Sequence, residues 1–115
     1  MKAFNHCKSS VKYFGGLEED YIDIHKWFDE SKDFYPDHRH RALRHHSQGI
    51  RQCEEEFGTT IFNHDDKEIP VRSIAEQHIR EDLGFIPTLE DWLKEIKPRA
   101  WMASTKKNIK KMNLM

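Results

Sequence analysis

Hydrophobic residues recur at helical spacing along most of the chain. The first stripe lies before a Gly-Gly pair, a typical helix end, and predicts a helix over residues 3–14. The second follows a run of acidic residues, which favours a helix N-terminus, and predicts a helix over residues 19–32 that stops before Pro36. These two stripes consist of Phe4, Cys7, Val11 and Phe14, and of Tyr21, Ile24, His25 and Phe28.

Three more helices are predicted after Pro36. The longest begins with Asp37 as its N-cap and ends at Gly58, because the apolar positions between them step by three and four residues. A fourth helix ends at Gly84, and a fifth spans residues 88–96, with Thr88 as N-cap and Asp91 at the capping-box position. The stripes of the third and fourth helices are Leu43, His46, Ile50, Cys53 and Phe57, and Ile74, Ala75, His78, Ile79 and Leu83.

A β-prone segment separates the third and fourth helices. Residues 59–63 and 68–71 favour extended backbone, and the polar residues 64–67 between them resemble a turn. Pro70 keeps the second strand short or at an edge. The predicted fold class is therefore mainly α, a compact bundle of about five helices with a small β-hairpin inserted near residues 59–71.

Length and charge refine this picture. A chain of 115 residues fits one domain, and we expect a single helical domain over residues 1–104 followed by a basic C-terminal tail over residues 105–115. Residues 97–115 carry six basic side chains and no acid, so the net charge of −1 leaves −7 on the first 96 residues. Nucleic acid is not expected to bind the acidic body, whereas the basic tail remains a candidate for such contact.

The expected location is the cytoplasm. The first residues lack the apolar run of a signal peptide, and no apolar stretch is long enough to span a membrane. Cys7 and Cys53 are far apart and fall on apolar stripes, so we expect buried free thiols rather than a disulfide or a thiolate metal site.

Histidines on the apolar stripes provide the candidate chemistry. His25, His46 and His78 fall on three different helices, and Asp29 and Asp82 follow the first and last of them by four residues, with His45 as a reserve ligand. Imidazole and carboxylate suit Zn, Fe and Mn, and helical bundles build metal sites from inward-facing side chains. The alternative for each histidine is a hydrogen-bonded core residue. An open coordination position would favour hydrolysis and a closed shell a structural role, and the sequence identifies no catalytic residue.

A second candidate surface lies at the start of the third helix. Its arginines and histidines could bind an anionic small molecule or a protein partner, or they could simply pair with neighbouring acids. These residues are His38, Arg39, His40, Arg41 and Arg44. Two hypotheses follow: a metal-binding protein that acts as a metal-dependent hydrolase, and a non-enzymatic interaction protein.

Several motifs together resemble a small uncharacterised domain family of bacteria and their phages. They are Arg39-His40-Arg41-Ala42-Leu43-Arg44-His45-His46, then Pro70-Val71-Arg72 with Glu76-Gln77-His78-Ile79 and Glu81-Asp82, and finally Ile86-Pro87-Thr88 with Asp91-Trp92-Leu93. The resemblance covers most of the chain except the tail. It implies a shared single-domain fold and, from its phage distribution, a role in infection or host takeover. It implies no substrate.

Overall fold

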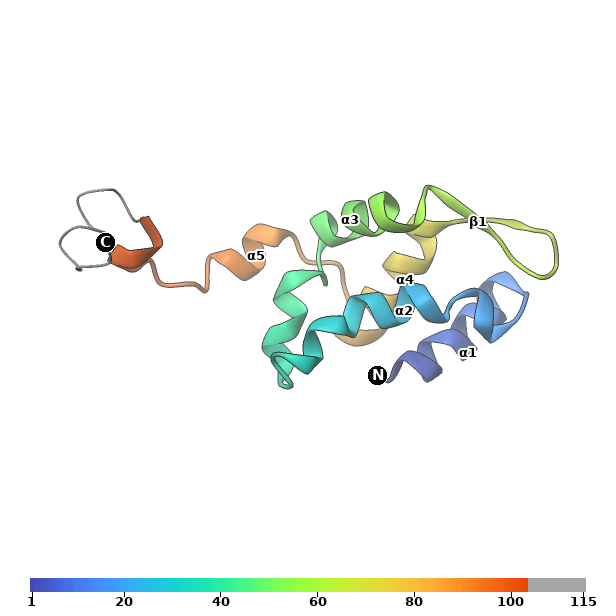
Figure 1. The fold of residues 1–115 in the computed structure, drawn as a ribbon, viewed down its shortest axis with the longest axis horizontal. Coiled ribbons are helices and arrows are strands. Elements are labelled where there is room, and N and C mark those ends of the chain that lie inside the picture. The colour runs from blue at the N-terminus through green and yellow to red at the C-terminus, as the bar shows by residue number, and fades with distance from the viewer. Residues whose placement is uncertain (104–115) are drawn as a thin grey trace, which may run out of the picture.

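The computed structural model describes residues 1–103, and the predicted basic tail lies outside the described residues. Four helices pack together, with a two-stranded hairpin at one end (Figure 1). Their bounds are α1 Ala3–Phe14, α2 Ile22–Asp29, α3 Ser47–Phe57 and α4 Val71–Leu83. Short 3-10 helices connect them: η1 Glu18–Asp20, η2 Glu30–Asp33 and η3 His38–Leu43. The predicted mainly α class with a small hairpin is confirmed.

The predicted single long helix after Asp37 is wrong. The segment forms η3, turns at residues 44–46, and restarts as α3. The side chain of His46 causes the restart, because its Nδ1 accepts a hydrogen bond from the Gly49 backbone N–H and so caps α3. Leu43, expected on the buried stripe, is consequently exposed. Asp37 does act as an N-cap, but for the 3-10 helix η3.

The predicted helix over residues 19–32 is also divided. It consists of η1, α2 and η2 in succession, so the backbone is α-helical only over Ile22–Asp29. The divided segment still turns Tyr21, Ile24 and Phe28 inward as the stripe predicts. All three glycine stops are found where expected, with α1 ending before Gly15, α3 before Gly58 and α4 before Gly84.

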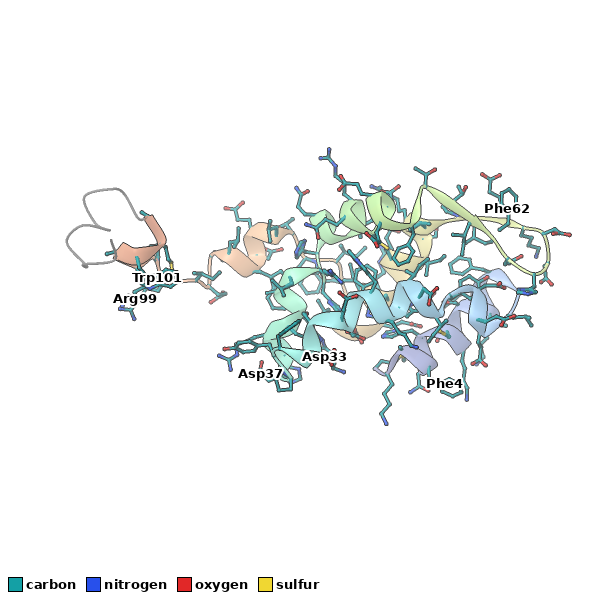
Figure 2. The ribbon with its side chains drawn as sticks, viewed as in Figure 1. Phe4, Asp33, Asp37, Phe62, Arg99 and Trp101 are labelled. Atoms are coloured by element: carbon teal, nitrogen blue, oxygen red, sulfur yellow. The ribbon has the colours of Figure 1, made fainter. Side chains whose placement is uncertain are left out.

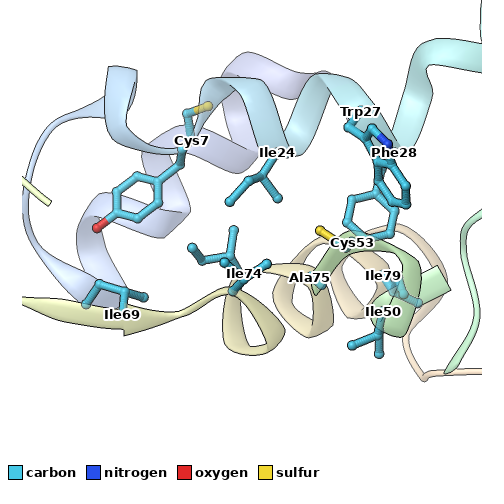
Figure 3. Packing of buried hydrophobic residues seen from close by; sticks show 12 residues of the cluster. Cys7, Ile24, Trp27, Phe28, Ile50, Cys53, Ile69, Ile74, Ala75 and Ile79 are labelled. Atoms are coloured by element: carbon cyan, nitrogen blue, oxygen red, sulfur yellow. The ribbon is translucent and has the colours of Figure 1, made fainter. Parts of the chain in front are cut away.

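The apolar core lies where α2, α3 and α4 meet (Figure 3). Phe28 from α2 is fully buried with Ile74 and Ile79 of α4, and Cys53 enters from α3. Burying a side chain of this size contributes about 1.5–3 kcal/mol to folding. Both cysteines are buried free thiols, as predicted, and burial raises the pKa of Cys7 to about 11 and that of Cys53 to about 12. By contrast, Phe4 and Phe62 lie on the outside (Figure 2).

The hairpin consists of β1 Thr60–Phe62 and β2 Glu68–Pro70, paired antiparallel. Polar contacts connect its turn to the segment that joins α1 to α2. Asn63 Nδ2 donates to the Phe14 carbonyl and to Tyr21 Oη, and Tyr21 Oη donates to the Gly15 carbonyl. His64 adds an ion pair, since its Nδ1 donates to Asp20 Oδ1 over 2.6 Å.

This ion pair predicts a pH-dependent contribution to stability. Hydrogen bonding to Asp20 raises the pKa of His64 above its ordinary value. The contribution is therefore fully present below the unfolded-state pKa of about 6.5 and is lost as the pH rises through the folded-state pKa. We expect His64→Gln to lower the free energy of unfolding more at pH 5.5 than at pH 8.5. Urea melts of both proteins measure this, and a mutational effect independent of pH would contradict it.

Beyond α4 the chain forms α5 Leu89–Leu93 and the 3-10 helix η4 Ala100–Ala103, which project away from the other helices (Figure 1). The predicted capping box is present, with Thr88 and Asp91 bonded reciprocally. The fifth helix is shorter than the predicted 88–96. Trp92 Nε1 donates to the His45 carbonyl and attaches α5 to the turn before α3. None of the helices within residues 1–103 is both long and apolar enough to cross a bilayer.

Candidate metal centre

Helix α1 turns a polar face towards α4. Its buried residues are His6, Cys7 and Ser10, so the buried face includes Cys7 of the predicted stripe and extends to the polar positions beside it, while Phe4 is exposed. His6 Nδ1 lies 2.8 Å from Glu81 Oε1 on α4. A carboxylate only accepts, so this nitrogen carries the proton and donates it. The other ring nitrogen, Nε2, lies 3.2 Å from Asp82 Oδ1, where it donates a hydrogen bond when protonated and is free to bind a metal ion when deprotonated.

A line of buried hydrogen bonds fixes the second imidazole. Gln77 Nε2 donates to the His6 carbonyl and to Glu81, so Gln77 Oε1 is an acceptor. The Ser10 hydroxyl lies 2.7 Å from this oxygen and 3.0 Å from the His6 carbonyl, and its one proton goes to these acceptors. His25 Nε2, 2.7 Å from Ser10 Oγ, must then be the donor of that contact.

The proton position of His25 also determines which nitrogen of His78 is a donor. With its proton on Nε2, His25 accepts at Nδ1, where His78 Nδ1 lies at 2.9 Å and must donate. Burial and the neighbouring His78 and His6 lower the pKa of His25 to about 2, which agrees with a neutral ring. His78 Nε2 has no hydrogen-bond partner among the described residues, although it is fully buried. This nitrogen faces two carboxylates, so it carries a proton there unless a metal ion takes the place of that proton.

Two carboxylates face these imidazoles. Asp82 Oδ2 lies 3.2 Å from His78 Nε2 and Asp29 Oδ2 lies 3.6 Å from it. His45 Nε2 contacts the same pair, at 2.9 Å from Asp82 and 3.6 Å from Asp29, and His40 Nε2 lies 3.3 Å from Asp29 Oδ1. The Asp82 side chain is 1% exposed and that of Asp29 is 14% exposed, so solvent reaches the cluster at Asp29.

The electrostatics of the cluster favour a bound cation. Burial alone would raise the pKa of Asp29, but His78 and His45 outweigh it and lower the pKa to about 2. The pKa of Asp82 is likewise lowered despite burial, through hydrogen bonds from His45, His6 and His78. Burial lowers the pKa of His78, yet the two carboxylates outweigh it and raise that pKa. Two ionised carboxylates therefore share a buried space and need positive charge beside them, which a metal ion in place of the proton on His78 would supply.

These atoms lie close enough together that they could hold a metal ion. His6, Asp29, His78 and Asp82 each offer one ligand atom, and the four atoms all lie within 4.8 Å of one another. His6, His25 and His78 form a second such group, but the nitrogens of His25 are already bonded to Ser10 and His78. A buried His/Asp group that could hold a metal ion is thus present, and Glu81 and His25 orient its two imidazoles as outer partners do in metalloproteins.

A family model described as a domain of unknown function, DUF6915, matches residues 1–102. The chain belongs to the DUF6915 family. Among curated proteins and solved structures, none matches the chain. The DUF6915 match spans α1 to the start of η4 and therefore includes every residue of the cluster.

The DUF6915 fold brings together some of the predicted ligands and not others. His78, Asp82 and Asp29 meet, and the reserve ligand His45 contacts both carboxylates. His25 contacts His78 Nδ1, the ring nitrogen of His78 that does not face the carboxylates. His46 is buried but is not in the cluster, because its Nδ1 caps α3 and its Nε2 contacts the Leu43 carbonyl.

The predicted Arg/His face does not form one surface in this DUF6915 domain. His40 is buried against Asp29, and Arg41 Nη2 lies 3.8 Å from Asp82 Oδ1. Arg44 stacks on Trp27, with its guanidinium carbon 4.0 Å from the ring centroid. His38 and Arg39 remain exposed, and Arg39 pairs with Asp37.

Sequence reasoning missed His6, Ser10, Gln77 and Glu81. A signal for the first two was present, because His6, Ser10 and Phe14 also follow a spacing of four residues and lie beside the expected stripe. On α4, Gln77 directly precedes the predicted His78, and Glu81 directly precedes the predicted Asp82. Two adjacent i,i+4 pairs on one helix are a pattern that favours an ordered polar cluster.

Proposed function

We propose that this protein binds one transition-metal ion and acts as a metal-dependent hydrolase. The observation that carries the proposal is the convergence of four ligand atoms, one each from His6, Asp29, His78 and Asp82, in which the buried His78 Nε2 makes no hydrogen bond among the described residues. Two ionised carboxylates in a buried space need positive charge between them, and a metal ion bound by both imidazoles would supply it.

The ligand types indicate the metal. Two imidazoles and two carboxylates suit Zn²⁺, Fe²⁺ or Mn²⁺, whereas Ca²⁺ and Mg²⁺ prefer all-oxygen sites. Both cysteines lie in the apolar core and contribute nothing to the set. Structural zinc sites are commonly closed shells rich in thiolate, so this donor set supports a reactive ion rather than a structural one.

Access for water supports hydrolysis. Asp29 is a candidate ligand and also lines an open groove between the start of α1 and the end of α2. A bound ion would lie next to this groove, where a water molecule can complete its coordination and become polarised. A closed structural site would have no such opening.

The first experiment is the metal content of untagged protein, purified without added metal or chelator and measured by plasma mass spectrometry. We expect close to one equivalent of zinc, iron or manganese per chain. The reconstituted protein should melt at a higher temperature than the chelator-treated protein, because an ion that binds only the folded state stabilises it. Protein that contains no metal and takes up none of these three ions on titration would overturn the proposal.

A further inference from the structure

We propose that the substrate of this centre is a phosphate monoester, whose phosphoryl oxygens are bound by Arg41 and which enters through the lysine-lined groove beside Asp29. The inference rests on the proposed metal-dependent hydrolysis and names its substrate class. Its support comes from groups that are not candidate metal ligands.

Arg41 has an unused donor next to the centre. Its guanidinium lies 3.8 Å from Asp82 Oδ1 through Nη2, and the side chain is 18% exposed. Its Nε–H is buried and donates no hydrogen bond among residues 1–103. A buried arginine N–H without an acceptor is costly, and an oxyanion at this position would satisfy it. The helix η3 thus presents an anion-binding group beside the Asp82 carboxylate.

The groove beside Asp29 supplies further positive charge. It has a volume of about 510 Å³, within the range of small-molecule sites. Three lysines line it, Lys2 from the start of the chain and Lys26 and Lys32 from α2 and η2. Its acids are Asp29, Glu30 and Asp33, of which Asp29 is a candidate metal ligand and Glu30 pairs with Arg44 at 3.8 Å. Three lysines and three acids leave the lining formally neutral, and it becomes positive when a metal ion takes up the charge of Asp29.

These charges distinguish a phosphate ester from a neutral ester or amide. A phosphate monoester is a dianion near neutral pH, so it gains from a metal ion, an arginine and a lysine-lined approach, whereas a neutral acyl substrate needs only one oxyanion donor. In the reaction the oxygen of one water forms a bond to phosphorus and the bond from phosphorus to the ester oxygen breaks. One proton of that water ends on the released alcohol, and inorganic phosphate is the second product.

The experiment uses the full chain loaded with the metal found in it. Inorganic phosphate is titrated into the protein by calorimetry, and hydrolysis of 4-nitrophenyl phosphate is compared with that of 4-nitrophenyl acetate. We expect phosphate binding and cleavage of the phosphate ester in preference to the acetate. Arg41→Met should weaken phosphate binding by about tenfold or more, while the protein still takes up metal because Arg41 is not one of the candidate ligands.

Two further variants serve as a control for Arg41→Met and as a separate test of the groove. Arg51→Met removes an exposed arginine of α3 that pairs with Glu55, and it should leave phosphate binding unchanged. The double variant Lys26→Met and Lys32→Met changes only exposed positions, so it tests the groove even where Arg41→Met fails to fold. It should lower kcat/KM for the phosphate ester several-fold at low salt, and the loss should shrink at high salt.

Each negative result would refute a different part of the proposal. Metal-loaded protein that binds no phosphate, or that cleaves the acetate and leaves the phosphate ester intact, would overturn the substrate class and leave the metal centre standing. Equal phosphate affinity in the wild type and Arg41→Met would remove Arg41 from the site. A chain that takes up no metal would refute the proposed function itself, and the substrate class with it.

Discussion

Asp82→Asn is expected to abolish metal binding. Asp82 contacts three imidazoles, at 3.2 Å from His6 Nε2, 2.9 Å from His45 Nε2 and 3.2 Å from His78 Nε2. The amide keeps the shape of the side chain but removes the charge and places a donor where a ligand atom is needed. Loss of outer partners costs about tenfold to hundredfold in metal affinity, so loss of this ligand should exceed about a hundredfold.

Metal content per chain, together with competition against a chromophoric chelator, measures the change. The matched control is Asp23→Asn, which removes an exposed carboxylate from α2 and should bind metal as the wild type does. Circular dichroism of both variants establishes that the fold is retained. An Asp82→Asn protein that is folded and still holds one equivalent of metal at wild-type affinity would exclude Asp82 as a ligand.

Gly49→Ala is expected to have the largest effect on stability. A Cβ built at Gly49 would lie 1.7 Å from the Arg44 carbonyl oxygen, and backbone cannot move aside as a flexible side chain does. Overpacked sites typically cost about 1–3 kcal/mol, and we expect about 3 kcal/mol or more here. That corresponds to a fall in Tm of more than about 10 °C for a domain of this size.

The same clash should disturb the candidate centre. Relief of the clash requires the turn at residues 44–46 to shift, and His45 lies in that turn, 2.9 Å from Asp82. Thermal melts of Gly49→Ala and of Gln48→Ala, an exposed neighbour in the same helix, separate this contact from a general effect of alanine. A Gly49→Ala protein as stable as Gln48→Ala would contradict the close packing of α3 against the turn.

Local signals predicted most of the fold. Helices α1 and α4 end where glycine follows the apolar stripe, and the box at Thr88 and Asp91 marks α5, because these features act within a few residues. The third helix was predicted too long because the apolar spacing continues through residues 44–46. Only the structure shows that the His46 side chain takes the Gly49 N–H and restarts the backbone there.

The candidate centre was less predictable, because it depends on distances between helices. Spacing placed His78 and Asp82 on one helix face and proposed Asp29 as their partner. The stripe of α1 correctly placed Cys7, Val11 and Phe14 towards the core, but it did not indicate His6, since a polar residue that packs inward looks like a surface residue in a hydrophobic pattern. The hydrogen bonds that fix the imidazole protons join residues up to 75 positions apart, as between His6 and Glu81.

The order of the cluster residues along the chain has a consequence for synthesis. One candidate ligand, His6, lies on the first helix, a second, Asp29, on α2, and the last two, His78 and Asp82, on α4. A ribosome makes the chain from its N-terminus, so the early helices emerge long before the ligand set is complete. We therefore expect a nascent chain to acquire its ion only after α4 has emerged, as one of the last steps of its folding.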